Sequence, residues 1–319
     1  MSNYQLLRLL SDGSFHSGSE LGEQLGLSRT SIWKTLSQLD AYAVELEVIK
    51  GKGYRVPGGL DLLDKEAVVS LLTSEVNKIS STEILLTCTS TNDYMSSKAS
   101  EFTEDHYQIC FAELQTAGRG RRGRAWVSPF AKNIYLSVGF KVHGGVEALS
   151  GMSLVVGLAV ASALTKLGLE ECYVKWPNDV VVAGKKICGI LIELQGEATT
   201  GWDVVCGIGL NVSMTRSQGK EIEQDWIALQ ERLAIGRNIV AAQILNELVH
   251  YLESFKRNGF AGFQSDWQQY DYLFGKVLLI SPSGVSGLGS GVDSHGALIL
   301  NVAGDNVLIN AGEVSVRRL

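Results

Sequence analysis

Residues 118–124 read Gly-Arg-Gly-Arg-Arg-Gly-Arg, and this run limits the structures that the middle of the chain can form. Four arginines in seven residues leave no apolar side chain to bury, and the glycines allow backbone conformations that other residues avoid. Each guanidinium presents a rigid fork of donors that suits a carboxylate or a phosphate. Because apolar segments on both sides, at 110–113 and 133–138, are predicted to be strands, we expect a mobile loop that covers a pocket.

The alternative for an arginine–glycine run is a solvated tail or a general nucleic-acid-binding patch. The whole composition argues against a protein that coats nucleic acid or an anionic membrane, because 34 acidic residues outnumber 28 basic ones and the net charge is −6. Any contact with DNA must therefore come from a local patch. At 319 residues the chain is long enough for two domains and a small third.

Targeting and redox features favour a cytoplasmic protein without a membrane partner. The N-terminus has no basic stretch followed by an apolar one, and the longest apolar run, at 153–164, is too short to cross a bilayer. The five cysteines are odd in number and widely spaced, and they form no CxxC or Cys/His cluster. We therefore expect reduced, buried thiols rather than disulfides or structural zinc, and the sequence assigns no ligands to any other metal.

The first sixty residues have the pattern of a helix-turn-helix. A short amphipathic helix is predicted around residues 6–10, and a second begins near Ser19 and ends at Gly26. Ser28 caps a third helix, which is predicted to run to Leu39. The short connection between the second and third helices has the spacing of a DNA-binding motif.

A basic hairpin follows the third helix directly. Residues 44–48 alternate as a strand, 50–53 form a glycine turn and 54–56 return, which predicts a wing. The alternative is a small helical dimerisation module. The side chains expected to reach DNA are Ser28, Arg29, Thr30, Trp33, Lys34, Ser37, Lys50 and Lys52.

Residues 57–59 read Pro-Gly-Gly and predict a linker, so we expect an α+β protein with domains at 1–60, 64–270 and 271–319. The predicted central helices cover 64–76, 90–95, 153–167 and 238–255, and the first of them has Val68, Leu71 and Leu72 as its buried stripe. The predicted central strands cover 84–86, 173–176, 180–182, 187–193 and 203–208. Five short strands then predict a small β-barrel, at 277–280, 287–291, 297–300, 307–309 and 314–316.

Four polar groups of the central domain could carry chemistry, although each also has an ordinary explanation. The segment 90–92, Ser-Thr-Asn, could face a cleft or simply cap a helix. The segment 175–179, Lys-Trp-Pro-Asn-Asp, fits a tight turn. Lys186 could hold a carboxylate or an α-phosphate, yet most lysines beside a turn are solvated, and Gln115 alone is uninformative.

Together these groups resemble those of a known family, the bifunctional biotin–protein ligases that also repress the biotin biosynthetic operon. The matching segments are 90–92, Gln115 with 118–124, 175–179, Lys186 with Gly189, and Gly-Ile-Gly-Leu-Asn at 207–211. The winged helix before them and the barrel after them occur in the same order, so the resemblance covers essentially the whole chain. It implies a class II synthetase-like catalytic domain and a C-terminal SH3-like barrel.

The resemblance implies a role for each matched residue. Ser90, Thr91 and Gln115 would hydrogen-bond the ureido ring of biotin, and Trp126 would form a wall on the nucleotide side. The implied catalytic residues are Lys186, which would stabilise the α-phosphate, Arg121, and Asp179, which would orient or deprotonate the incoming amine. The implied biotin and biotinyl-AMP site is Ser90, Thr91, Asn92, Gln115, Gly118, Arg119, Gly120, Arg121, Arg124, Trp126, Lys186, Gly189, Gly207 and Asn211.

This assignment fits the charges of the reactants. The carboxylate of biotin attacks the α-phosphate of ATP, and because both are anions the site must supply positive charge, with Mg²⁺ expected. The adenylate would hydrolyse in water, so a loop that closes over it is needed. A lysine of the biotin carboxyl carrier protein of acetyl-CoA carboxylase is the implied acceptor.

The resemblance also implies a regulatory role. If the arginine loop orders only around the adenylate, a dimer surface that includes the loop depends on that ligand. A homodimer that carries two winged helices could then bind a palindromic operator of the biotin operon. Two alternatives stay open: a lipoate–protein ligase, and a DNA-binding biotin sensor with little ligase turnover. The winged helix could also have lost its operator.

Overall fold

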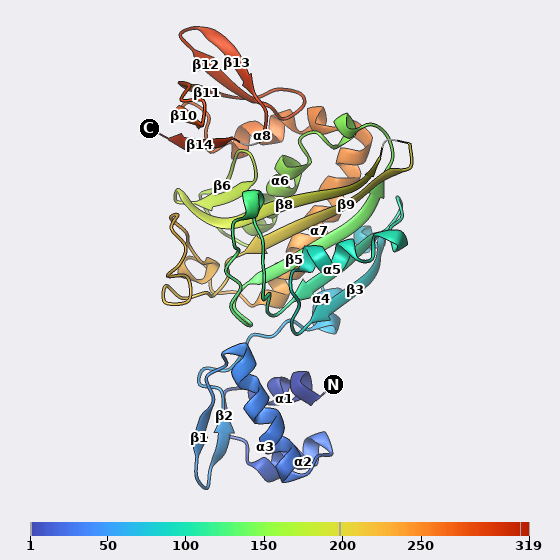
Figure 1. Ribbon diagram of the computed structural model, residues 1–319, viewed down its shortest axis with the longest axis vertical. Helices are drawn as coiled ribbons and strands as arrows, with labels where there is room; N and C mark the ends of the chain where they lie inside the picture. Colours follow the sequence, from blue (N-terminus) through green and yellow to red (C-terminus); the bar gives the residue numbers. More distant parts are fainter. Residues whose placement is uncertain (1, 198, 313, 319) are drawn as a thin grey trace.

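The computed structural model describes residues 2–197, 199–312 and 314–318, and Figure 1 shows three units along its longest axis. A winged helix-turn-helix lies at one end, a seven-stranded mixed sheet with helices occupies the middle, and a five-stranded antiparallel sheet lies at the other end. The predicted α+β architecture is therefore confirmed. We keep 1–60, 64–270 and 271–319 as proposed domain limits, although residues 1 and 319 themselves lie outside the described residues.

The N-terminal unit is built on three helices and a hairpin. Its elements are α1 (Ser2–Leu10), α2 (Gly18–Leu25), α3 (Arg29–Ser37), the 3₁₀ helix η1 (Gln38–Tyr42), β1 (Glu47–Ile49) and β2 (Gly53–Arg55). Ser17, rather than Ser19, caps α2, and its partner in a reciprocal capping box is Glu20. Gly26 ends α2 with a left-handed backbone, and the Ser28 hydroxyl accepts the Ser31 N–H at the start of α3.

The predicted first strand of the wing is wrong in its position. It was expected at 44–48, but β1 begins only at Glu47. Val44 and Leu46 lie half-buried before the strand, whereas Val48 is 60% exposed, so the alternation of buried positions shifts by one residue at Glu47. The shift arises because a two-stranded wing has solvent on its outer face, and no core selects the side on which Val48 must lie.

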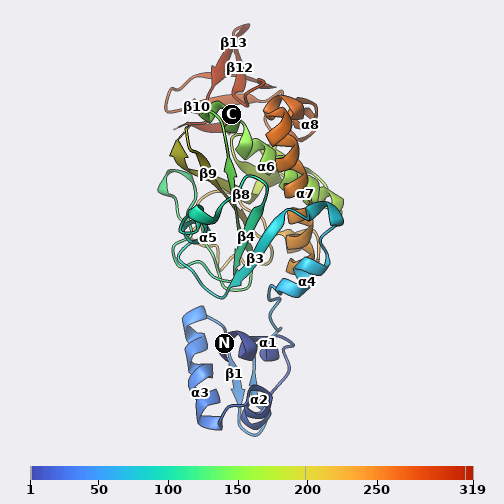
Figure 2. The same ribbon diagram turned by 90° about the vertical axis from the view of Figure 1, so that its right-hand side faces the viewer.

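The central sheet has the strand order β3-β4-β5-β9-β8-β7-β6, with β3 and β4 parallel and the remaining neighbours antiparallel. Its strands are β3 (Ile79–Leu85), β4 (Tyr107–Ala112), β5 (Ile134–Val142), β6 (Cys172–Lys175), β7 (Asp179–Val182), β8 (Lys185–Glu197) and β9 (Gly201–Leu210). The helices α4 (Lys65–Ser70), α6 (Met152–Lys166), α7 (Arg237–Asn258) and α8 (Gln264–Tyr270) cover one face, and the short α5 (Thr91–Ser96) lies on the other (Figure 2). The polar segments of the sequence therefore gather on the face with less helical cover.

Helix α6 forms the centre of the core. Almost every residue of it is buried, between α7 on one side and β6, β7 and β8 on the other. Gly157 lets it lie close to the sheet, because a Cβ there would be 2.9 Å from Val174 Cγ1. By length and composition alone the segment Val146–Lys166 could cross a membrane, but 67% of its apolar window is buried inside the protein, as expected for a core helix.

The predicted helix at 64–76 is shorter than expected. Helix α4 ends at Ser70, and a separate 3₁₀ turn follows at Ser74–Val76. Of the predicted buried stripe, Val68 is fully buried, whereas Leu71 is 47% exposed. The cause is a tertiary hydrogen bond, because the Thr73 N–H is donated to Asn246 of α7 and draws the chain out of the helix.

The C-terminal unit is one antiparallel sheet with the order β13-β12-β11-β10-β14. Its strands are β10 (Val277–Ser281), β11 (Ser286–Val292), β12 (Leu298–Val302), β13 (Asp305–Ile309) and β14 (Ser315–Arg318). The five strands fall close to the five predicted ranges. The connection between β13 and β14 reaches the mouth of the cavity described below.

The position of α6 in the core predicts its energetic importance. We expect Leu158→Ala, at a fully buried position, to lower the free energy of unfolding by about 2–5 kcal/mol, because the cavity it leaves cannot refill. Leu71→Ala is the matched control, and its effect should stay near or below about 0.5 kcal/mol because about half of Leu71 remains exposed to solvent. Urea titration of both variants is the measurement, and equal losses would contradict the assigned burial.

Candidate active site

A cavity of about 820 Å³ opens on the face of the central sheet that carries α5. The residues that line it include almost all of those predicted to bind substrate or to act in catalysis: Ser90, Thr91, Asn92, Gln115, Arg119, Gly120, Arg121, Arg124, Trp126, Asp179, Lys186, Gly189, Gly207 and Asn211. Gly118 lies just behind the wall, where its carbonyl accepts the Trp126 N–H at 2.8 Å. Segments far apart in the sequence thus form one site.

One end of the cavity is rich in uncharged hydrogen-bonding side chains, and Asn92 at this end also donates to the Glu193 carboxylate at 2.7 Å. The Gln115 side-chain oxygen accepts from the Thr91 N–H at 2.9 Å, and its amide donates to the Ser128 hydroxyl at 3.1 Å. The Ser137 hydroxyl lies 2.8 Å from Thr91 Oγ1 and 2.6 Å from Asn92 Oδ1. This network fixes the rotamers of the wall before any ligand binds.

Ser90 precedes α5 but does not cap it with its side chain. Its carbonyl accepts from Tyr94, yet its hydroxyl makes no capping hydrogen bond and is buried at the cavity wall. The capping explanation of the Ser-Thr-Asn segment is therefore wrong for this side chain.

The floor of the cavity is the glycine-rich strand β9. A Cβ on Gly207 would overlap the side chain of Asn92, and one on Gly209 would overlap the indole of Trp126. At Gly189 of the neighbouring β8, a Cβ would lie 3.0 Å from the same indole. The indole can therefore lie against the sheet only because both strands lack side chains beneath it.

The opposite end of the cavity is ionic. Lys186 Nζ lies 2.7 Å from Asp179 Oδ1 and 5.4 Å from the centroid of the Trp126 ring. A register shift between β7 and β8, at Val180 and Val181, brings the lysine to the same side as the aspartate. Asp179 Oδ1 is buried and has no partner besides this lysine among the residues that the structure describes.

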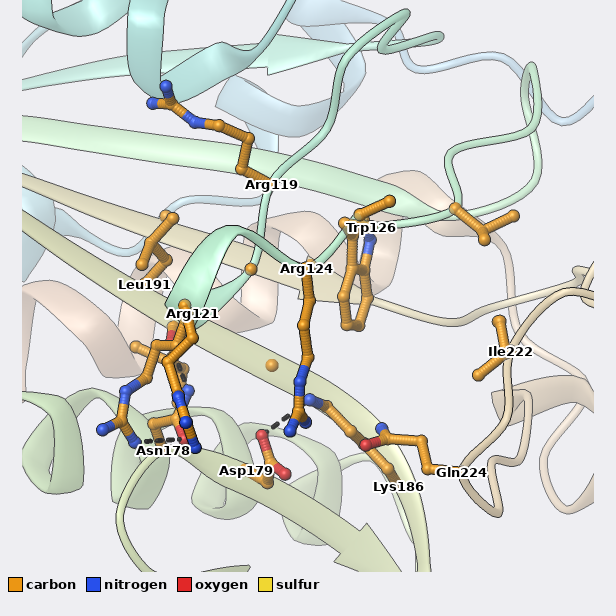
Figure 3. Close-up of a pocket in the computed structure, with 18 of the residues that line it drawn as sticks. Arg119, Arg121, Arg124, Trp126, Asn178, Asp179, Lys186, Leu191, Ile222 and Gln224 are labelled. Carbon is orange, nitrogen blue, oxygen red and sulfur yellow. Dashed lines mark hydrogen bonds and ion pairs between the residues drawn. The ribbon is translucent and has the colours of Figure 1, made fainter. Parts of the chain in front are cut away.

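The arginine loop turns across this ionic end. Residues Arg121–Gly123 form a single 3₁₀ turn. Figure 3 shows Arg121 and Arg124 reaching from the loop toward Asn178 and Asp179 at the end of β6 and the start of β7. Arg121 donates to Asn178 Oδ1 at 3.1 Å and to the carbonyls of Ala311 and Gly312 in the β13–β14 connection. Burial lowers the pKa of the Arg121 guanidinium, and the Asp179 carboxylate opposes that shift.

Arg119 does not join the other arginines. Its guanidinium lies 2.6 Å from Asp93 Oδ1 and 3.0 Å from Glu193 Oε1, and in Figure 3 it points away from Arg121. The resemblance implies that Arg119 belongs to the ligand site, but in the structure its side chain joins the loop to α5 and β8. A ligand would have to replace these two carboxylates before Arg119 could cover it.

Several cavity residues were missed by sequence reasoning. The connection between β9 and α7 contributes Glu221, Ile222, Gln224 and Trp226, and β14 contributes Arg317. Ile222 and Trp226 belong to a small apolar cluster with Met214, and Arg216 lies 4.3 Å above the Trp226 ring. Trp126 and Trp226 both line the cavity, but their separation in the sequence matches no motif that would have predicted this part of the site.

The predicted DNA-contacting residues lie on helix α3, which runs along the N-terminal unit in Figure 1, at its N-cap, and in the turn between β1 and β2. All eight are exposed, and Trp33 is the most exposed large apolar side chain among the described residues, at 65%. Two of the hydroxyls are already used within α3, because Ser28 caps the helix and Ser37 donates to the Lys34 carbonyl. Arg29, Thr30, Trp33 and Lys34 therefore form the available surface of α3.

Comparisons with known proteins agree with this organisation. The model of the biotin/lipoate A/B protein ligase family matches residues 85–211, and a helix-turn-helix domain model matches residues 3–55. A biotin protein ligase from Aquifex aeolicus, solved in complex with biotin and ATP, superposes with a TM-score of 0.64 and 27% identity. The superposition covers 76% of this chain and all of that one.

Curated relatives extend the match to the whole chain. The bifunctional ligase/repressor BirA of Escherichia coli is 38% identical over 316 residues, which cover 98% of this chain and 96% of the relative. The biotin–[acetyl-CoA-carboxylase] ligase of Mycobacterium tuberculosis is 34% identical over 234 residues, which cover 70% of this chain and 85% of the relative. The chain therefore belongs to the family of bifunctional ligase/repressor proteins named BirA.

Proposed function

We propose that this protein activates biotin with ATP to biotinyl-5'-AMP and transfers the biotinyl group to a lysine of a biotin carboxyl carrier protein. The observation that carries the proposal is one cavity with an uncharged hydrogen-bonding end at Thr91 and Gln115 and an ionic end at Lys186 and Arg121. A neutral ureido ring fits the first end, and a carboxylate beside a phosphate fits the second. The five free cysteines agree with a cytoplasmic location.

The first step joins two anions. A carboxylate oxygen of biotin attacks the α-phosphorus of ATP, a phosphorus–oxygen bond forms, and the bond to pyrophosphate breaks. Lys186 and Arg121 supply positive charge where negative charge accumulates. Lys186 is paired with Asp179 at 2.7 Å before substrate arrives, so its charge is already in position.

The second step requires a neutral amine. The lysine ε-amine of the carrier attacks the acyl carbon, AMP leaves, and the amine loses a proton. Asp179 is the proposed acceptor or orienting group, because its buried Oδ1 has only Lys186 as a partner among the described residues. When Lys186 turns toward the phosphate, this oxygen becomes available to the incoming amine.

Mg²⁺ is proposed as a companion of ATP rather than a resident of the protein. Among the described residues there is no group of three histidine, cysteine, aspartate or glutamate side chains that could hold a metal. A magnesium ion bound chiefly through nucleotide phosphates needs only one or two protein carboxylates, and Asp179 and Glu221 line the cavity. Such an ion would supply further neutralisation of the phosphates.

The hydrogen-bonding end favours biotin over lipoate. A dithiolane ring offers no N–H or carbonyl group, so lipoate would leave Thr91 and Gln115 facing an apolar ligand. The sensor alternative is less well supported, because biotin alone carries one carboxylate, whereas the ionic end of the cavity holds both Lys186 and Arg121.

The direct test is the intact mass of an apo biotin carboxyl carrier domain after incubation with this protein, biotin, ATP and Mg²⁺. We expect one biotinyl addition that requires ATP, and Lys186→Gln should slow it at least 100-fold because one cation is lost from the phosphate. Lys185→Gln is the matched control, since Lys185 is the exposed neighbour of Lys186 and should retain activity within about twofold. No addition by the wild-type protein would refute the ligase.

The arginine loop is proposed as a lid that retains the adenylate. Arg121→Gly should release biotinyl-AMP and biotinylate lysines of bystander proteins, because the contacts to Asn178 and to the β13–β14 connection are lost. Arg122→Gly is the control for the loss of one charge and the gain of one glycine in the same loop, since Arg122 also lines the cavity but is exposed and already has a positive φ that glycine tolerates. Mass spectrometry of an added bystander protein measures the leak, and modification of the carrier alone would contradict the lid.

We further propose that a biotinyl-AMP-dependent homodimer represses the biotin operon. Strand β8 pairs with β9 along one edge from Cys188 to Glu197, whereas on its other edge the pairing with β7 extends only to Gly189. Among the described residues, this second edge has no strand partner from 191 to 197. A second copy could pair there. Arg119 binds Glu193 on this same strand, so a ligand that reorders the loop also changes the edge.

This regulatory proposal predicts that biotin and ATP together tighten DNA binding. We expect at least a tenfold gain in affinity for operator DNA, accompanied by dimerisation in sedimentation, because the adenylate reaches both ends of the cavity and would hold the loop in the arrangement that the dimer needs. Neither biotin nor ATP alone should have this effect, and Lys186→Gln should abolish it. Equal DNA affinity with and without the two ligands would rule out the corepressor role.

A further inference from the structure

The connection between the N-terminal unit and the ligase unit is held to the ligase unit by a series of hydrogen bonds from residues 61–64. On the ligase side, Asp61 Oδ2 accepts the N–H of Arg237, the first residue of α7, at 2.7 Å. The Leu63 N–H is donated to Glu113 Oε1 at 2.6 Å, and the Asp64 N–H to Asn238 Oδ1 at 2.8 Å. A flexible tether would leave these groups to water.

At the centre of these contacts lies an ion pair that is completely buried. Arg237 and Glu113 are each 0% exposed and lie 2.8 Å apart. Arg237 also donates to the carbonyls of Asn133 at 3.0 Å and of Asp61 at 2.5 Å. Burial raises the pKa of the Glu113 carboxyl, and the charge of Arg237 opposes that shift. No proposed step of the ligase reaction uses either residue.

The pair is an inefficient way to stabilise a fold. Removing two charges from water costs several kcal/mol, and apolar side chains of the same size often give equal or greater stability. An arginine ion pair instead imposes a specific geometry, because each guanidinium N–H must point at a particular acceptor. Here the acceptors belong to the linker, to the end of β4 and to the start of β5.

The same linker is tied to the DNA-binding unit. The Tyr4 hydroxyl of α1 donates to the Leu63 carbonyl at 3.0 Å, and Arg8 lies 3.1 Å from Asp64. The Leu60 N–H is donated to the Ser11 carbonyl at 3.0 Å. The segment 60–64 is therefore bonded to both units at once, although Figure 1 shows it as a single narrow connection.

A second, apolar contact lies beside the linker. Phe130 is buried in the hydrophobic cluster of the N-terminal unit, and its ring centroid is 5.1 Å from that of Tyr42. Leu86 and Leu114 join the same cluster. These three ligase residues belong to the segments that carry the Ser-Thr-Asn group, Gln115 and Trp126. Two separated contacts prevent rotation about either one.

We propose that Arg237, with Glu113 and Asp61, is a positioning cluster that holds the DNA-binding unit at one fixed angle to the ligase unit. A dimer of such chains presents its two α3 helices at one spacing, which matches one arrangement of half-sites. The inference rests on the proposed DNA-binding function. It adds that the orientation in which α3 is presented to DNA is set at the ligase end of the linker. The residues that set it lie outside both the winged helix and the cavity.

Two variants loosen the cluster in different ways. Asp61→Ala removes the exposed linker acceptor and leaves the buried pair intact, so it should fold normally. Arg237→Met with Glu113→Gln removes both buried charges at similar volume, which avoids an unpaired charge. The matched control is Lys141→Met with Asp203→Asn, which removes a half-buried pair between β5 and β9, away from the linker.

Hydrogen exchange of the full-length protein tests the rigidity of the linker. The amides of Leu63 and Asp64 should be protected in the wild-type protein and in the control. They should exchange at least tenfold faster in Asp61→Ala and in the double variant, with carrier biotinylation unchanged within about twofold. Equal protection in all four proteins would overturn the proposal.

DNA binding tests the consequence. The probes are a palindromic duplex selected by the wild-type protein from random sequences with biotin and ATP present, and the same duplex cut to one half-site. Both loosened variants should lose at least tenfold in affinity for the palindrome and keep their affinity for the half-site, because only the paired arrangement needs a fixed angle. Unchanged palindrome affinity, or equal losses on both probes, would overturn the positioning role. If the wild-type protein selects no palindrome, the repressor proposal fails, while hydrogen exchange still decides the linker claim.

Discussion

The cavity depends on the close approach of two side chains to a part of the sheet that has glycines beneath them. Asn92 and Trp126 come from different segments, and each lies over a glycine of β9. The indole of Trp126 also lies close to Gly189, and Lys186 Nζ lies 5.4 Å from its centroid. A side chain at Gly207 or Gly209 would displace the wall itself, so the glycines determine where every other group of the site can lie.

Ion pairs within the protein hold the cationic groups until an anion replaces them. Lys186 is paired with Asp179, Arg119 with Asp93 and Glu193, and Arg121 with an amide and two carbonyls. These partners offset the repulsion between the cations that gather in the cavity of an otherwise acidic protein. Binding of an anionic ligand is then an exchange of partners, and the carboxylates it releases become available for other work. Under the proposed mechanism, Asp179 would then orient the incoming amine, and the release of Glu193 would change the outer edge of β8.

The sequence predicted what local patterns carry, and it failed where distant segments decide. The loop of arginines, the turn before Asp179 and the capped helix α3 each follow from neighbouring residues. Leu71 was misplaced because a hydrogen bond from Thr73 to α7 ends the helix, and no local pattern records that bond. The cavity residues near Trp226 were missed because they lie in an irregular segment that takes its position from a small apolar cluster. Glu113 and Arg237 were missed for the same reason, since a buried ion pair between residues far apart leaves no periodic signal.

The position of the DNA-binding unit explains how one chain can combine two activities without a long-range mechanism. Leu86, Leu114 and Phe130 pack into the core of the winged helix, and each lies within a few residues of a group that lines the cavity. A ligand that tightens the cavity wall therefore acts on the segments against which the DNA-binding unit rests. The same contact explains why a rigid linker is useful. If the winged helix moved freely, a shift of these three segments would not change its direction, whereas under the positioning proposal a unit held by Arg237 and Glu113 would carry the shift to the spacing of the two α3 helices in a dimer.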